Sequence, residues 1–285
     1  MRLVTYMSPG EVALAGVIVD DTVFSLQPAG FPDMLSVIAG GAAARASIAS
    51  YLKAVPPAAG KSLDRVVLLA PIPKPPKLIC VGLNYRDHAA EAKMEIPSVP
   101  TIFSKFNTAI TGPGAPIILP KNTAKPDYEA EFAVVIGTGG RHIPASQWRD
   151  HVYGYMCLND VSARDFQLAT SQWLMGKTFD TFAPCGPWLT TADEIEDPHN
   201  LDISLTINGE TLQNSNTKHL IFGIPALIEF LSSAFTLEPG DIITTGTPAG
   251  VGFSKKPPRW LLPGDDVVVK IQGLGELRNP VVAEV

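Results

Sequence analysis

The sequence predicts an α+β protein in which β-strands predominate, rather than a regular alternation of strands and helices. Proline and glycine are frequent, with 26 and 24 copies in 285 residues, and this composition favours many turns and short strands over a bundle of helices. Most apolar runs beyond residue 77 are short and are bounded by Gly, Pro, Asn or Asp, which is typical of strands. Among these runs, residues 224–234 have the apolar spacing of an amphipathic helix.

Residues 1–70 are expected to form a small module that precedes a larger domain of residues 71–285. Two strands and then a helix are predicted in the module, at residues 11–19, 22–26 and 32–54. We place the boundary at the proline-rich run 71–76, because prolines separate folded units along a chain.

The larger domain is expected to contain short strands and a few helices. Strands are predicted at residues 78–82, 129–136, 152–158, 202–207, 241–245 and 266–271. A short helix is predicted from Tyr85 to about Lys93, with the Asn84 side chain as its cap. The segment Met94–Pro100 that follows contains two prolines and is expected to be a mobile loop.

Charge and hydropathy argue against two classes of partner. The formal net charge is −6 and no block of lysine and arginine stands out, so the chain lacks the basic face that binding to a nucleic acid requires. No segment reaches the ~20 apolar residues of a membrane span. An anionic small molecule would have to be held by local cations, a metal ion or backbone N–H groups.

The cysteines and the N-terminus indicate a reducing compartment. Cys80, Cys157 and Cys185 form no CxxC pair, and three scattered cysteines do not suggest a disulfide framework. Cys185 is predicted to lie in a loop, and the other two in the core. Residues 1–10 lack the continuous apolar stretch of a signal peptide, so a cytoplasmic location is expected.

The segment from Asp127 to Ile136 carries the strongest chemical signal. Side chains on a strand alternate between its faces, so Asp127, Glu129 and Glu131 are predicted to share one face. Adjacent carboxylates repel each other and are costly to bury without a cation. A solvated strand face is the simpler interpretation, but residues 132–136 turn continuously apolar, which indicates a strand that enters the core. An all-carboxylate set suits a hard cation such as Mg²⁺ or Mn²⁺.

Further polar residues are candidates for acid–base chemistry and binding. His88 and Glu91 are three residues apart, so on a helix they share a face, and the carboxylate can orient the imidazole. Asp160 stands at the end of an apolar strand, where it is either a ligand or a helix cap. Lys177 could face an anionic ligand or solvent. The glycine-rich turn 244–252 could hold a carboxylate or simply end a strand.

Several separated motifs together resemble the fumarylacetoacetate hydrolase family, over residues 77–285. In chain order they are GLNYRDHAAE, FSKF, DYEAEFAVVIG, NDVSARDFQ, GKTFDTFAPCGP and GDIITTGTPAGVG, with a closing PGDDV. The resemblance implies a mixed β-sandwich roll, preceded here by a small N-terminal α/β module, and assembly as a homodimer.

The resemblance also implies roles for individual residues. Glu129, Glu131 and Asp160 would bind the divalent cation, and His88 with Glu91 would form a dyad on a lid that activates water. Positions near a bound oxo acid are matched by Lys105, Arg164, Gln167, Lys177 and Thr247. Of these, Lys177 would stabilise negative charge that develops on the substrate.

The sequence therefore predicts a metal-dependent hydrolase that cleaves a carbon–carbon bond in an acylpyruvate-like 2,4-dioxo acid through a pyruvate enolate. Decarboxylation of oxaloacetate and isomerisation or hydration of a 2-oxo-dienoate are alternatives that use the same enolate. A protein that kept the fold as an inactive binding homologue is a third possibility, against which the full set of carboxylates and the His–Glu pair weigh.

Overall fold

The computed structural model describes residues 1–285 and contains two large β-sheets that share a core, together with a separate two-stranded sheet. The long sheet has the strand order β4-β3-β2-β1-β14-β12-β11-β17-β6-β7. Its central strands are β6 (Leu78–Gly82), β11 (Ala130–Ile136), β12 (Val152–Asn159), β14 (Ala183–Thr191) and β17 (Ile242–Thr244), and its edge strand is β7 (Thr101–Ser104). Neighbours in this run are antiparallel except β17 and β6, which are parallel.

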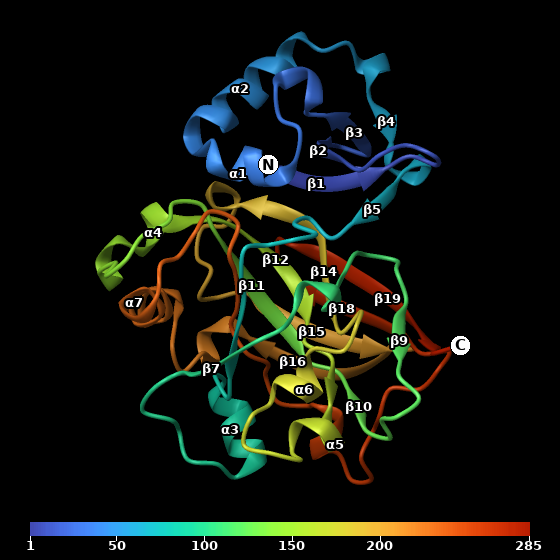
Figure 1. Ribbon diagram of the computed structural model, residues 1–285, viewed down its shortest axis with the longest axis vertical. Helices are drawn as coiled ribbons and strands as arrows, with labels where there is room; N and C mark the ends of the chain where they lie inside the picture. The colour runs from blue at the N-terminus through green and yellow to red at the C-terminus, as the bar shows by residue number, and fades with distance from the viewer.

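The second sheet packs across the long one and closes the core. Its order is β16 (Glu210–Asn216), β15 (Asp202–Ile207), β18 (Asp266–Ile271), β19 (Gly275–Ala283) and β9 (Ile117–Leu119). A cluster of 35 buried apolar residues joins the two sheets, with Phe132 and Tyr155 from the long sheet and Leu205 and Val269 from the other. Helix α7 (Ile224–Ala234) buries Leu227, Ile228 and Leu231 against this core and lies on one side of the body (Figure 1).

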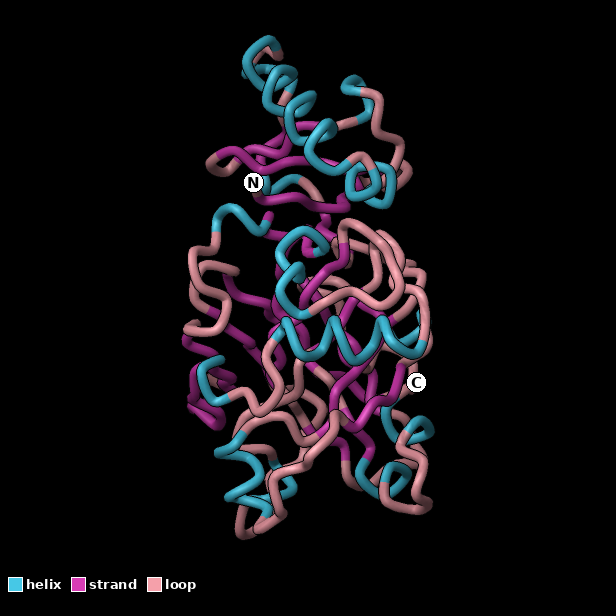
Figure 2. Tube along the Cα trace, turned by 90° about the vertical axis from the view of Figure 1, so that its left-hand side faces the viewer, coloured by secondary structure: helices cyan, strands magenta, loops and turns pink.

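The N-terminal residues form a layer of their own above this body, as Figures 1 and 2 show. The layer contains β1 (Arg2–Met7), β2 (Leu14–Val19), β3 (Thr22–Ser25), β4 (Lys61–Ser62), β5 (Val67–Leu69), α1 (Met34–Ala39) and α2 (Gly41–Ala54). Strand β1 pairs with β14 through Arg2–Thr190 and Leu3–Leu189, so the long sheet runs through both parts of the chain. The domain boundary near residue 70 stays a prediction.

Shorter elements complete the fold. They are α3 (Arg86–Ala92), α4 (Trp148–His151), α5 (Arg164–Gln167), α6 (Leu174–Lys177), β8 (Ile110–Thr111), β10 (Pro126–Asp127) and β13 (Ser162–Ala163). Short 3₁₀ turns span Gln27–Ala29, Pro57–Ala59, Leu63–Arg65, Asn107–Ala109, Ala145–Gln147, Ala192–Glu194, Thr217–His219 and Gly252–Ser254. None of the helices has the length and apolar character needed to span a membrane.

The predicted α+β class with a predominance of strands is confirmed, and α7 has the predicted bounds. The helix predicted at 32–54 is two helices, because Gly41 at the start of α2 adopts a positive φ of 52°, which interrupts the helical path after α1. Asp33 caps the first of these, accepting a hydrogen bond from the Ser36 N–H at 2.8 Å.

Two local predictions were wrong. Asn84 does not cap α3, which has no side-chain cap. Its side chain is fully buried and instead bonds the backbone of Phe222 and of Thr245. Cys185 lies on β14 rather than in a loop, and its complete burial raises the pKa of its thiol to about 12.

Candidate functional site

Three buried carboxylates meet where β11 and β12 lie side by side. Glu129, Glu131 and Asp160 each offer an oxygen within 4.8 Å of the others. The strand register explains their proximity, since Glu131 pairs with Leu158 and the Asp160 N–H donates to the Glu129 carbonyl oxygen at 2.9 Å. The structure thus brings together the three residues that the sequence predicted as metal ligands.

The two glutamates of this cluster differ in their electrostatic surroundings. Burial opposes ionisation of Glu129, but Lys177 and Arg164 outweigh it and lower the pKa of this carboxyl to about 2. Burial, reinforced by the negative charges of Asp160 and Glu129, raises the pKa of Glu131 well above its ordinary value. The cationic side chains around the cluster pair with Glu129 and Asp160 rather than with Glu131. Glu131 accepts a hydrogen bond from the Gly246 N–H.

Three buried cations surround the carboxylates. Lys177 Nζ lies 2.9 Å from Glu129 and 2.7 Å from Asp160, and Lys105 Nζ lies 2.6 Å from Asp160. A guanidinium nitrogen of Arg164 lies 2.6 Å from a carboxylate oxygen of Glu129. Burial lowers the pKa of Lys105, whereas for Lys177 the attraction of Asp160 and Glu129 outweighs burial and raises the pKa.

Arg164 is held by Asp127, a residue to which the sequence gave no separate role. Asp127 is fully buried, and its Oδ2 lies 2.8 Å from Nε and 2.8 Å from a terminal guanidinium nitrogen of Arg164. It also accepts the N–H groups of Gly252 and Phe253. Asp165, which is next to Arg164 in the sequence, accepts from the Thr123 hydroxyl and from the N–H groups of Ala124 and Phe166. The partner of Arg164 is therefore Asp127, 37 residues away in the sequence, rather than the adjacent Asp165.

A cavity of about 450 Å³ opens onto this cluster. Among its lining residues are the predicted Glu129, Glu131, Arg164, Gln167, Lys177, Thr247, His88 and Glu91. Gln167 accepts a hydrogen bond from Arg164, and the Thr247 hydroxyl accepts one from Gln213. The cavity also has an apolar wall that includes Phe103 and Trp173, and a lysine at position 256 that the sequence analysis did not single out.

His88 and Glu91 lie together on α3 at the side of this cavity. His88 Nδ1 lies 3.3 Å from a Glu91 carboxylate oxygen, and Glu91 also accepts the Gly250 N–H at 3.0 Å. Burial would raise the pKa of Glu91, but hydrogen bonds from His88, Gly250 and Ser254 outweigh it and lower the pKa. An ionised Glu91 can hold the imidazole with its Nε2 free for proton transfer.

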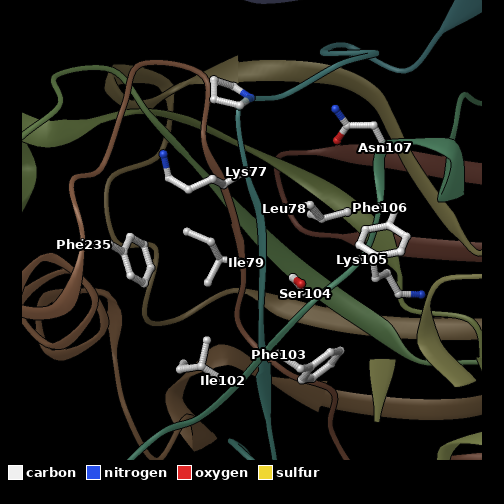
Figure 3. Close-up of a pocket in the computed structure, with 11 residues that line it drawn as sticks. Lys77, Leu78, Ile79, Ile102, Phe103, Ser104, Lys105, Phe106, Asn107 and Phe235 are labelled. Atoms are coloured by element: carbon white, nitrogen blue, oxygen red, sulfur yellow. The ribbon is translucent and has the colours of Figure 1, made fainter. Parts of the chain in front are cut away.

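Lys105 contacts the cluster but does not line this cavity. Its stem lines a separate cavity of about 660 Å³ between β6, β7 and Phe235, where Figure 3 shows it on the opposite side from Lys77 and Phe235. Its ammonium is fully buried and also donates to the carbonyl oxygens of Val161 and Phe182. Lys105 therefore acts on Asp160 and is not among the residues that line the cavity with the carboxylates.

The carboxylate cluster has the chemistry of a divalent-cation site. All the donors are oxygens, which Mg²⁺ and Mn²⁺ prefer. Asp160 Oδ1 is buried and, although close to Lys105, accepts no hydrogen bond of suitable geometry. The raised pKa of Glu131 marks the deficit of positive charge that a cation would fill. Glu129, Glu131 and Asp160 are therefore the residues that could hold one.

This chain belongs to the family described as fumarylacetoacetate (FAA) hydrolase C-terminal, which matches residues 77–282. The family is one of enzymes, and the resemblance found in the motifs is confirmed. Two relatives are the mitochondrial oxaloacetate tautomerases of Rattus norvegicus and Xenopus laevis. The rat protein is 44% identical over 99% of this chain and 92% of its own length. The frog protein is 50% identical over 78% of this chain and 70% of its own length.

Solved structures of similar proteins share the whole fold. A putative HpcE protein from Mycobacterium smegmatis has a TM-score of 0.89 and 36% identity, covering 100% of both chains. Maleylpyruvate hydrolase from Sphingobium sp. SYK-6, in complex with manganese(II) ion and pyruvate, has a TM-score of 0.85 and 32% identity, again covering 100% of both chains.

Proposed function

We propose that this protein transfers a proton at the carbon next to the oxo group of a small 2-oxo acid, and that its reaction is the keto–enol tautomerisation of oxaloacetate. One observation carries the proposal. Glu129 and Glu131 of the carboxylate cluster line the same cavity of about 450 Å³ as His88 and Glu91, so a chelating site and a proton-transfer group face the same small molecule. The relatives named oxaloacetate tautomerase support the choice of substrate.

The carboxylates, His88 and Lys177 each have a part in this reaction. A divalent cation held by Glu129, Glu131 and Asp160, Mg²⁺ or Mn²⁺, would supply Lewis acidity toward the oxo acid. In enolisation His88, oriented by Glu91, accepts a proton from the carbon beside the oxo group and delivers it to the oxo oxygen, and in ketonisation the same transfers run in reverse, from the enol oxygen to the carbon. Tautomerisation moves one proton within the substrate and consumes no water, so this single acid–base group suffices. Lys177 places positive charge beside the cluster, where it offsets charge developing on the oxo oxygen.

Hydrolysis of an acylpyruvate-like 2,4-dioxo acid, as predicted from the sequence, is the second candidate. The same His88–Glu91 pair could draw a proton from water, and the structure of maleylpyruvate hydrolase is similar along the full chain. The two reactions differ in whether water enters the cavity beside the substrate. Decarboxylation of oxaloacetate and isomerisation of a dienoate stay predictions of the same kind, as do the homodimer and the cytoplasmic location.

Absorbance at the enol band of oxaloacetate tests the first proposal. Enol prepared in an aprotic solvent is diluted into buffer with Mg²⁺ or Mn²⁺, and the protein is expected to accelerate its decay beyond buffer and metal alone. General-base assistance contributes about 10²–10⁴-fold, so His88→Ala should lose that factor. A panel of acylpyruvates, followed by mass spectrometry, measures hydrolysis in parallel. Unaccelerated enol decay together with rapid acylpyruvate cleavage would establish the second candidate instead, and inactivity on the whole panel would favour a binding homologue.

A further inference from the structure

The lysine and arginine side chains of the cavity differ in whether they have ion-pair partners within the protein. Of the lysine and arginine side chains that line it, Arg164 is engaged by Asp127 and Glu129, and Lys177 by Glu129 and Asp160. The third is Lys256, which is exposed and takes part in no ion pair or hydrogen bond within the protein. Its charge is therefore available to a molecule in the cavity.

The backbone that carries Lys256 is fixed to the same framework as the carboxylate cluster. Asp127 accepts the N–H groups of Gly252 at 2.7 Å and Phe253 at 3.0 Å, and it also binds Arg164. Gly252 in turn accepts the N–H groups of Lys255 and Arg259 on either side of Lys256. A lysine on an anchored turn keeps its reach into the cavity while its side chain stays free.

A dicarboxylic substrate would place two negative groups in this cavity. The carboxylate next to the oxo group would lie at the cluster, where a cation held by the three carboxylates, together with Lys177, would offset its charge. The second carboxylate would then meet the remaining wall, where Gln167, Thr247 and Ser254 are neutral and Lys256 is a cation without a partner. The carboxylate on this wall, Glu91, is already engaged by His88 and the Gly250 N–H. A monocarboxylic 2-oxo acid offers Lys256 nothing to bind.

We propose that Lys256 determines specificity by binding the distal carboxylate of a 2-oxo dicarboxylic acid, a proposal that rests on the oxo-acid chemistry proposed above. Lys256 touches the substrate away from the reacting carbon, so it selects among oxo acids and takes no part in the proton transfer. The preference for dicarboxylates then belongs to one residue of the 252–259 turn.

Two stable ligands with the same five-carbon chain isolate this contact. 2-Oxoglutarate ends in a carboxylate where 2-oxovalerate ends in a methyl group, and calorimetry with Mn²⁺ measures the affinity of the full-length protein for each. Wild-type protein is expected to prefer 2-oxoglutarate. A charge-assisted hydrogen bond on an exposed rim is worth roughly tenfold in affinity, so Lys256→Met should lose that preference by about this factor and leave 2-oxovalerate binding unchanged.

Lys255 provides the matched control. It neighbours Lys256 but does not line the cavity, and its Nζ donates to the Leu212 carbonyl oxygen. Lys255→Met should keep the wild-type preference, and Lys256→Arg should retain most of it. An unchanged preference in Lys256→Met, an equal loss in Lys255→Met, or a wild-type protein that prefers neither ligand or binds neither would overturn the proposal. A preference that depends on Lys256 in a protein without tautomerase activity would uphold it while rejecting the reaction proposed above.

Discussion

Substituting Asp127 by Asn tests whether this residue, rather than Asp165, holds Arg164 in the cavity. The carboxylate receives five contacts while fully buried: two from Arg164 to Oδ2, one each from the N–H groups of Tyr128 and Gly252 to Oδ1, and one from the Phe253 N–H to Oδ2. An asparagine has one acceptor oxygen and one donor group in the same space. Whichever way the amide is turned, it directs N–H toward at least two other donors.

The size of the loss follows from the groups left without an acceptor. With the amide oxygen at the Oδ2 position, which is the less costly orientation, the Tyr128 and Gly252 N–H groups lose their acceptor and Arg164 keeps only a neutral acceptor in place of the carboxylate, although Glu129 still pairs with the guanidinium at 2.6 Å. Hydrogen bonds to charged groups are worth about 1.5–3 kcal/mol, and breaking a buried pair costs about 3–5 kcal/mol. Asp127→Asn should therefore lower the free energy of unfolding by about 3–5 kcal/mol, because the remaining Glu129 contact prevents a larger loss.

Urea unfolding of a double-mutant cycle measures the coupling directly. Arg164→Met is combined with Asp127→Asn in one cycle and with Asp165→Asn in the other, which serves as the control. Contacting residues in one network couple by about 0.5–3 kcal/mol, and the upper half of that range is expected for Asp127. Asp165 binds Thr123, Ala124 and Phe166 rather than Arg164, so its coupling should be near zero. Equal coupling in both cycles, or a larger value for Asp165, would refute the assignment.

Four further outcomes are expected. Glu131→Gln should weaken Mn²⁺ binding in calorimetry and remove the rise in melting temperature that the metal gives wild-type protein; unchanged affinity would exclude Glu131 as a ligand. The irregular segment Met94–Pro100 beside α3 should become less sensitive to proteolysis when metal and oxalate are bound, and equal sensitivity would contradict a lid there. His88→Ala should reduce acylpyruvate hydrolysis by about 10²–10⁴-fold and leave metal affinity nearly intact, whereas full activity would exclude it as the base. Burial lowers the pKa of His199 below 6.5, and its Nε2 accepts the Ile224 N–H, so its stabilisation is full above pH 6.5 and is lost as the pH falls below that value. Acid should therefore destabilise wild-type protein more than His199→Gln, and parallel stability–pH curves would show that another group is responsible.

Local patterns were sufficient to predict several of the strands and the pair of glutamates, whereas Asp160 was assigned as the third ligand only through the family resemblance. The period of two places Glu129 and Glu131 on one side of the chain, and the apolar run after them indicates burial. The Pro- and Gly-bounded runs gave strands 202–207 and 266–271 with the bounds seen in the structure. These features depend on neighbours a few residues away, and such interactions are visible in a single sequence.

Pairings across long sequence distances could not be read in this way. Asn84 is a residue type that commonly caps helices, yet its side chain donates hydrogen bonds to the carbonyl oxygens of Phe222 and Thr245, which are 138 and 161 residues away in the sequence. The contact of Lys105 with Asp160 and the pairing of β1 with β14 have the same character. In each case a tertiary partner satisfies a buried polar group or an open strand edge, and local spacing contains no record of which partner that is.

The charge balance of the cluster explains why so many ionisable groups are buried together. The four carboxylates Asp127, Glu129, Glu131 and Asp160 face the three cations Lys105, Arg164 and Lys177. Four ionised carboxylates against three cations would leave one net negative charge, and burial beside Asp160 and Glu129 raises the pKa of Glu131. Buried ion pairs are a weak source of stability, so a network of this size is better explained by what it binds. A divalent cation beside four ionised carboxylates and three cations would give the set a net positive charge, and a cavity with that charge favours an anionic oxo acid over a neutral molecule.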